Sequence, residues 1–404
     1  MPSHYRNFHN SVPWLILFLE AVFIVIFYFS DSDEDISSIS YPGFQDVNHM
    51  VIFGFGFFLT FLKRYGFSST GFNLLIIVLG VQCSVLIEEL LLFLPYSERE
   101  DDMRRITKAT LSLTAVVIST GAVLGKTNPV QLSLMTVVEM VALHMSRWMH
   151  KTFLQISDNT SMMHVHLFGA YFGLAASSRF SEPLPGSEKN ASTPKSDLLS
   201  MLGTVFLWVF WPSFNSVLLW DKSKAIYNTY FALAVSTVTA FMLSALTTKD
   251  GKFKMTHIHS AVLAGGVAVG YAAHSIKYPW IAMILGLLAS VISILGSYCL
   301  PRCLNPVLKI HDTSGVHFTF GLPSMLGALA QVVLLVLENW TDIPSLRHLV
   351  AIHIWAFFLT MDVALITGFI TGFILNFKLF KTIPVSKYFE DQFYWEFPHL
   401  AVGF

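Results

Sequence analysis

The chain has 404 residues, of which 54% are hydrophobic and only 13% are charged, whereas an ordinary globular domain carries about 25% charged residues. Lipid is the solvent that suits most of so apolar a chain, whose mean hydropathy is +0.59 and which contains 36 phenylalanines. A formal charge of −1 gives no basic field for nucleic acid, so that class of partner is excluded.

Apolar segments long enough to cross a bilayer recur along the chain, and each predicts a transmembrane helix. The first, 13–30, lacks the small-residue cleavage site of a signal peptide and is expected to stay attached. The others are 46–62, 70–95, 107–125, 129–149, 160–180, 198–219, 226–246, 257–275, 280–299, 314–337 and 349–377. The sequence therefore predicts an all-α polytopic membrane protein of about 12 helices, with a single membrane domain over 1–404 that includes a tail at 379–404.

The basic residues beside these spans predict the orientation. With the N-terminus in the cytoplasm, fifteen of the 25 lysines and arginines lie on the inside and the other ten on the outside, as the positive-inside rule favours. An even number of helices places both termini on the same side. Both termini, and with them the tail, are therefore expected in the cytoplasm.

The stretch DNTSMMHVHLFGAYFGL begins with an acid, Asp158, and carries a histidine, His166, into an apolar helix. The step of eight residues from one to the other spans about 12 Å of helix, which is most of the way to the midplane of a hydrocarbon core about 30 Å thick. Ionisable residues inside a membrane are read as functional by default. For Asp158 an N-cap role, accepting from the amides of Thr160 or Ser161, is an equal alternative to a pore role.

A second stretch, HDTSGVHFTFGLP, repeats this spacing in the other half of the chain. Asp312 is followed eight residues later by Phe320, where the first copy has His166. Matched spacing in two halves of a membrane protein indicates a structural repeat whose facing helices build one site near the midplane. The pattern predicts that this site keeps one imidazole of two, and Asp312 shares the N-cap alternative.

Other side chains bring little further chemistry. Three cysteines cannot form a disulfide framework. Two of them, Cys299 and Cys303 in CLPRC, are either inert thiols or candidates for acylation beside a membrane exit. No predicted span holds a nucleophile–base pair or a cluster of metal ligands, so the sequence predicts no enzyme, no metal site and no cofactor.

Five motifs follow one another over most of the chain: GAVLGKTNPVQL, HVHLFGAYFGL, FLWVFWPSFNS, HSAVLAGGVAVG and KIHDTSGVH. Together they resemble the Rh branch of the ammonium transporter superfamily. The tail YFEDQFYWEFPHLAVGF, with no glycosylation sequon in the first predicted loop, is similar to the erythrocyte Rh blood-group polypeptides of the D and CE type.

The resemblance implies a pseudo-twofold fold with one pore per subunit of a trimer, lined at mid-depth by two histidines. Aligned on FGAYFGL, the first histidine falls on His166, and aligned on the second stretch the other falls on Phe320. The family's pair of gating phenylalanines falls on Phe214 and Leu111, and its acid before the first histidine falls on Asp158.

In the second copy the corresponding acid is Asp312. A vestibule glutamate of the family falls on Arg147, which makes the mouth of the pore neutral or repulsive to cations. A phenyl ring at Phe320 is expected to fill the lumen and to leave His166 with an unpaired nitrogen.

These departures favour a Rh blood-group-type subunit of an erythrocyte plasma-membrane complex with weak or lost ammonium conduction. The partners implied by the resemblance are the Rh-associated glycoprotein, in a heterotrimer, and ankyrin of the membrane skeleton, bound by the tail. The alternative is an active channel for ammonium, ammonia or carbon dioxide.

Overall fold

The computed structural model describes residues 3–29, 39–92, 100–183, 188–303, 310–338 and 343–397, and these residues form helices and no strand. The longer helices are α1 (Ser3–Tyr28), α4 (Gly66–Leu91), α5 (Asp102–Val123), α6 (Pro129–Leu154), α8 (Val165–Ser177), α9 (Pro194–Ser216), α10 (Ser223–Thr247), α11 (Met255–Val269), α12 (Pro279–Cys303), α14 (Leu322–Glu338) and α15 (Ile343–Leu375). Short elements are α2 (Tyr41–His49), η1 (Met50–Gly54), α3 (Phe55–Phe58), η2 (Leu59–Phe61), α7 (Asp158–Met162), η3 (Glu188–Asn190), η4 (His317–Gly321), η5 (Lys378–Phe380), η6 (Val385–Lys387) and η7 (Asp391–Phe393).

The helices confirm an all-α polytopic membrane protein. Within the described residues, nine helical stretches are long and apolar enough to cross a membrane, and α11 is a shorter apolar helix. The count of twelve crossings remains a prediction.

Three of the predicted helices are not continuous. The predicted span 46–62 is made of α2, the π-helix η1, α3 and the 3-10 turn η2. The predicted span 160–180 is interrupted between α7 and α8, and the span 314–337 opens with the π-helix η4. Because π-helical turns change the direction in which side chains point, such interruptions often occur at functional sites.

Glycines bring the central helices into backbone contact. A Cβ atom at Gly169 of α8 would lie 2.3 Å from the carbonyl oxygen of Ala115 in α5. One turn further on, a Cβ at Gly173 would lie 2.6 Å from the Cα of Ser119. Only glycine permits this approach, which supplies packing energy where lipid offers no hydrophobic drive.

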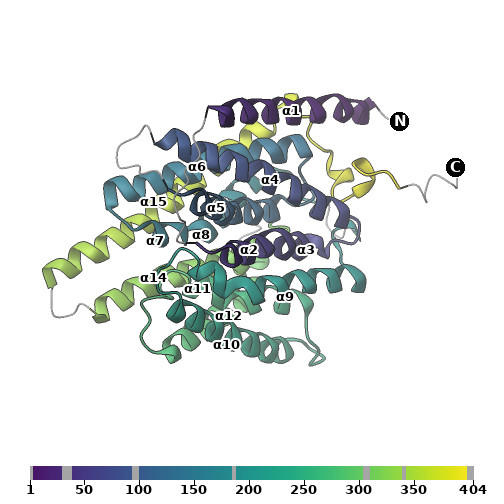
Figure 1. Cartoon of the computed structure of the whole chain (residues 1–404). Coiled ribbons are helices and arrows are strands. Elements are labelled where there is room, and N and C mark those ends of the chain that lie inside the picture. Colours follow the sequence, from purple (N-terminus) through teal and green to yellow (C-terminus); the bar gives the residue numbers. More distant parts are fainter. Residues whose placement is uncertain are drawn as a thin grey trace.

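Helix α1 lies along the edge of the bundle, beside α4 and α6 (Figure 1). Only 6% of its stretch Ser11–Tyr28 is buried, so most of this helix is left to face lipid. A hydrogen bond of 3.2 Å from Gln82 Nε2 to Glu20 Oε2 satisfies the acid that α1 carries into the apolar region.

The C-terminal tail packs against the start of α4. The Asp391 carboxylate accepts hydrogen bonds from the N–H groups of Phe67 at 3.0 Å and Ser68 at 2.8 Å. Trp395 Nε1 donates to Ser68 Oγ at 3.0 Å. Asp391 thus satisfies amides that the first turn of α4 leaves without a partner, and the tail is a docked part of the membrane domain up to residue 397.

Candidate functional site

His166 lies in the first turn of α8 and is almost fully buried, with 1% of its surface exposed. Its imidazole hydrogen-bonds the backbone of Met163, while Nε2 has no partner in the described part of the chain. An unpaired polar nitrogen in apolar surroundings carries a free-energy cost. The unpaired nitrogen predicted from the sequence is confirmed.

Phe320, in η4, faces His166 with nearly parallel rings, whose centroids are 6.4 Å apart at an interplanar angle of 15°. This contact brings the matching positions of the two stretches face to face. On its other sides the Phe320 ring contacts Phe55 at 5.9 Å and Phe58 at 6.0 Å, both from α3. Three phenyl rings, none with a hydrogen-bond donor or acceptor, therefore gather around the Phe320 position.

Two aromatic residues of α9 cover His166 on another side. The His166 ring centroid lies 5.4 Å from that of Phe214 and 5.5 Å from that of Trp211, which stacks on the imidazole at 18°. Sequence reasoning found Phe214 but missed Trp211, although it precedes Phe214 by three residues and so shares its helix face. A Cβ at Gly266 would lie 2.7 Å from Trp211 Cδ1, so this glycine makes room for the indole.

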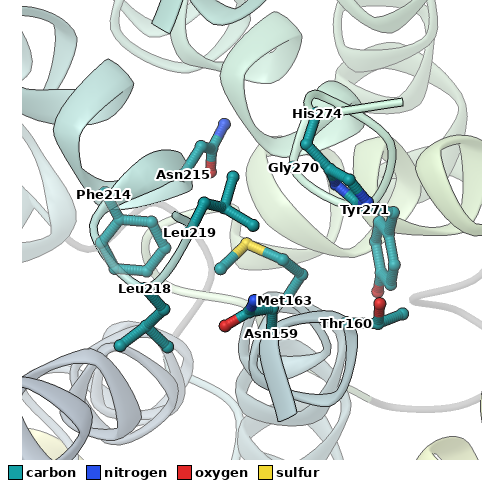
Figure 2. Close-up of a pocket in the computed structure, with 10 residues that line it drawn as sticks. All are labelled: Asn159, Thr160, Met163, Phe214, Asn215, Leu218, Leu219, Gly270, Tyr271 and His274. Atoms are coloured by element: carbon teal, nitrogen blue, oxygen red, sulfur yellow. The ribbon is translucent and has the colours of Figure 1, made fainter. Parts of the chain in front are cut away.

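A small hollow lies against Phe214, with about 10 Å³ that could hold the centre of a water molecule. Figure 2 shows Phe214 and Leu218 on one side of it and Tyr271 and His274 on the other. The hollow is lined by Asn159, Thr160, Met163, Phe214, Asn215, Leu218, Leu219, Gly270, Tyr271 and His274. Phe214 thus lines this hollow and also contacts His166.

Two amide oxygens in the hollow, Asn159 Oδ1 and Asn215 Oδ1, have no hydrogen-bond partner among the described residues. The Asn215 amide nitrogen donates to Thr229 Oγ1 at 3.1 Å and to the Gly266 carbonyl at 3.0 Å, which fixes the orientation of its oxygen. Leu111 is fully buried in α5 and is not among the residues that line the hollow. Its predicted role as an outer gate remains a prediction.

Asp158 does not cap α7, so that alternative was wrong. Ser157 is the N-cap and accepts from the Thr160 amide at 3.4 Å. The Asp158 carboxylate instead pairs with Lys108 of α5 and, at 3.0 Å, with Arg147 of α6. The neighbouring hydroxyl takes the capping position, which leaves the carboxylate free to neutralise two nearly buried cations.

These groups form a larger ionic cluster, here called the Asp158 cluster: Glu88, Glu100, Lys108, Arg147 and Asp158. Lys108 Nζ lies 2.7 Å from Glu100 Oε2, and Arg147 Nη1 lies 3.6 Å from Glu88 Oε1. The cluster joins α4, α5, α6 and α7 at one end of the bundle. Arg147 is paired within it and adds no free positive charge to the mouth of the hollow.

Asp312 bonds the backbone where its helix begins, as its capping alternative predicted, although Val316 is the N-cap residue of η4. Its carboxylate accepts from the backbone N–H groups of Gly315 at 2.9 Å, Val316 at 3.0 Å and His317 at 2.9 Å, where η4 begins. Three such bonds hold the start of the helix that carries Phe320. The two acids at matching positions of the repeat therefore have different roles.

The candidate acylation sites, Cys299 and Cys303, belong to the last turns of α12, but their side chains lie outside the described residues. The acylation remains a prediction. Within the searched, described part of the chain no three His, Cys, Asp or Glu side chains are placed to hold a metal ion.

A family model, curated sequences and solved structures all relate this chain to the same group of proteins. Residues 13–396 match the model of the Ammonium Transporter Family. Over 100% of both chains, the sequence is 43% identical to the RH-like protein of Macaca mulatta and 43% identical to the blood group Rh(CE) polypeptide of Homo sapiens. The fold is similar to the solved structure of Nitrosomonas europaea Rh50, described as one of the Rhesus family of channels, with a TM-score of 0.74 and 29% identity over 89% of this chain and 93% of that one.

Proposed function

The chain belongs to the Ammonium Transporter Family, and from this premise we propose that it is a Rh blood-group-type subunit whose own pore is closed at mid-depth. As a Rh-type membrane protein related to ammonium channels, it is not an enzyme. The observation that supports closure is the Phe320 ring, which faces His166 and packs on Phe55 and Phe58.

We infer closure because the rings of Phe55, Phe58 and Phe320 can neither donate nor accept a hydrogen bond. Two facing imidazoles could share a proton and exchange hydrogen bonds with a small amine in an apolar tube. Here His166 offers its unpaired nitrogen to a ring that neither donates nor accepts. A cation that reached this depth would lose its hydration without compensation, and a neutral ammonia molecule would meet a filled lumen.

The competing proposal is an active channel for ammonium, ammonia or carbon dioxide. The hollow favours it, because two amide oxygens without a partner among the described residues belong to its lining, beside Phe214. Stopped-flow ammonia uptake in proteoliposomes separates the two proposals. We expect the ammonia uptake rates of wild type and His166→Ala to equal the rate of protein-free liposomes. Substantial uptake by wild type that is lost in His166→Ala would instead support the active channel.

The partners follow from the family resemblance. We propose a heterotrimer with the Rh-associated glycoprotein in the erythroid plasma membrane and a link to ankyrin through residues 379–404. Affinity purification of the chain should recover both partners. Deletion of 379–404 should abolish ankyrin binding and leave the glycoprotein bound, and ankyrin recovery after the deletion would refute the tail as its site.

The orientation follows from the basic residues beside the spans. We propose that the Asp158 cluster and the hollow face outward, while the tail and the loop at Gly125 face the cytoplasm. Epitope tags at either terminus should be labelled only after the cell membrane is permeabilised. A C-terminal tag that is labelled on intact cells would reverse the assignment.

A further inference from the structure

One acid deep in the bundle has no part in the path through His166. Glu139 of α6 is fully buried, with 0% of its surface exposed. It lies ten residues from the start of the helix, or about 15 Å, which is half the thickness of a hydrocarbon core. It therefore lies near the middle of the membrane.

Among the described residues, no cation forms an ion pair with Glu139. In the described structure its carboxyl group hydrogen-bonds one side chain, Ser119 of α5, between Glu139 Oε2 and Ser119 Oγ, and its Oε1 has no hydrogen-bond partner. The other two acids in the apolar helices of this region differ. Glu89 lies 2.6 Å from Arg105, and Glu88 lies 3.6 Å from Arg147.

The hydrogen atoms around Ser119 decide the protonation state of Glu139. Ser119 Oγ lies 2.9 Å from the carbonyl oxygen of Val116 as well as close to Glu139 Oε2, and a hydroxyl carries only one hydrogen. If Glu139 were ionised, two acceptors would compete for that hydrogen. If Glu139 keeps its proton, it donates to Ser119 Oγ, which in turn donates to the Val116 carbonyl, and both contacts are satisfied.

The packing also excludes the solvent that an ionised carboxylate would require. Ser119 is fully buried, and its backbone lies directly against Gly173 of α8. The unpartnered Oε1 is far less costly as the carbonyl oxygen of a neutral acid than as part of an unpaired anion.

We propose that Glu139 is a proton-binding site in the membrane interior, a neutral carboxyl group that donates to Ser119 and holds α6 to α5. The site lies beside α8, the helix that carries His166, but it is separate from the phenyl-blocked path. Its ligand is the proton itself, and the proposal does not depend on whether the pore conducts.

Infrared spectroscopy of the protein in lipid nanodiscs at neutral pH tests the site directly. The C=O stretch of a protonated carboxylic acid should be present in wild type and lost in Glu139→Gln, whose amide can still donate to Ser119. It should persist in the matched control Glu89→Gln, because Glu89 is paired with Arg105. If Glu139→Gln removed carboxylate bands and left the acid region unchanged, the proposal would be overturned.

A second variant keeps the test independent of how Glu139→Gln folds. Ser119→Ala retains the acid but removes its hydrogen-bond acceptor, so the same C=O band should move to higher frequency. An acid band that does not respond to Ser119→Ala would show that the proton does not lie between these two side chains.

Discussion

Replacing Phe320 with histidine is expected to restore ammonia uptake only when Phe58 is replaced by alanine as well. The histidine would face His166 from the position where the phenyl ring now lies 6.4 Å away, and would rebuild an imidazole pair. Phe55 and Phe58 would still fill the space on the other side of the new ring. Phe58 is the larger obstacle, because its ring also stacks on His259 at 3.7 Å and is fixed there.

Stopped-flow uptake in proteoliposomes should therefore rank the variants. Wild type, Phe320→His and Phe58→Ala should stay near the protein-free rate, and the double variant should rise at least about tenfold, equivalent to a barrier lower by about 1.4 kcal/mol. Adding His166→Ala to the double variant should remove the gain. Leu111→Phe should increase the uptake rate less than the double variant does, because Leu111 is not among the residues that line the hollow and is already fully buried.

The uptake rates of these variants show whether conduction requires the imidazole pair or only more space in the lumen. If Phe58→Ala alone matched the double variant, space rather than the imidazole pair would control conduction. Size-exclusion profiles of each variant show whether a silent variant is folded. A folded double variant without flux would place the block elsewhere on the path, with Phe214 and Trp211 as the next rings to test.

The facing of His166 and Phe320 could be predicted because it rests on two local signals, the apolar periodicity of a helix and the spacing after an acid. The packing of Phe320 against Phe55 and Phe58 could not be predicted from the sequence. Phe55 and Phe58 belong to a helix that is preceded by a π-helical stretch, and the direction of their side chains depends on that change of register. No periodicity rule applied to 46–62 gives that register.

The same limit explains why the N-cap alternative was wrong for Asp158, whereas Asp312 does bond the backbone at the start of its helix. Asp312 satisfies amides three to five residues further along the chain, so its role is local. The partners of Asp158 are eleven and fifty residues away, at Arg147 and Lys108. An N-cap signal in the sequence cannot reveal a competing ion pair at that separation, nor show that Ser157 takes the cap.

Asp158→Asn is consequently expected to lower folded stability nearly as much as Asp158→Ala. Asparagine is as good an N-cap as aspartate, so a capping role would make it neutral. It carries no charge, however, and it would leave Arg147 and Lys108, whose side chains are 9% and 7% exposed, without their shared anion. Breaking a fully buried pair costs roughly 3–5 kcal/mol, and the 31% exposure of the Asp158 side chain reduces the expected cost to about 2–3 kcal/mol.

Two controls distinguish the ion pair from the cap. Ser157→Ala removes the observed cap and should cost only about 1 kcal/mol. Asp158→Asn combined with Arg147→Gln removes one charge of each sign and should recover part of the stability, because Lys108 keeps Glu100 at 2.7 Å. The stability of all four variants is measured by folded yield and by thermal unfolding of the detergent-solubilised protein. If Asp158→Asn were as stable as wild type, the carboxylate would act as a cap and not as an ion-pair partner.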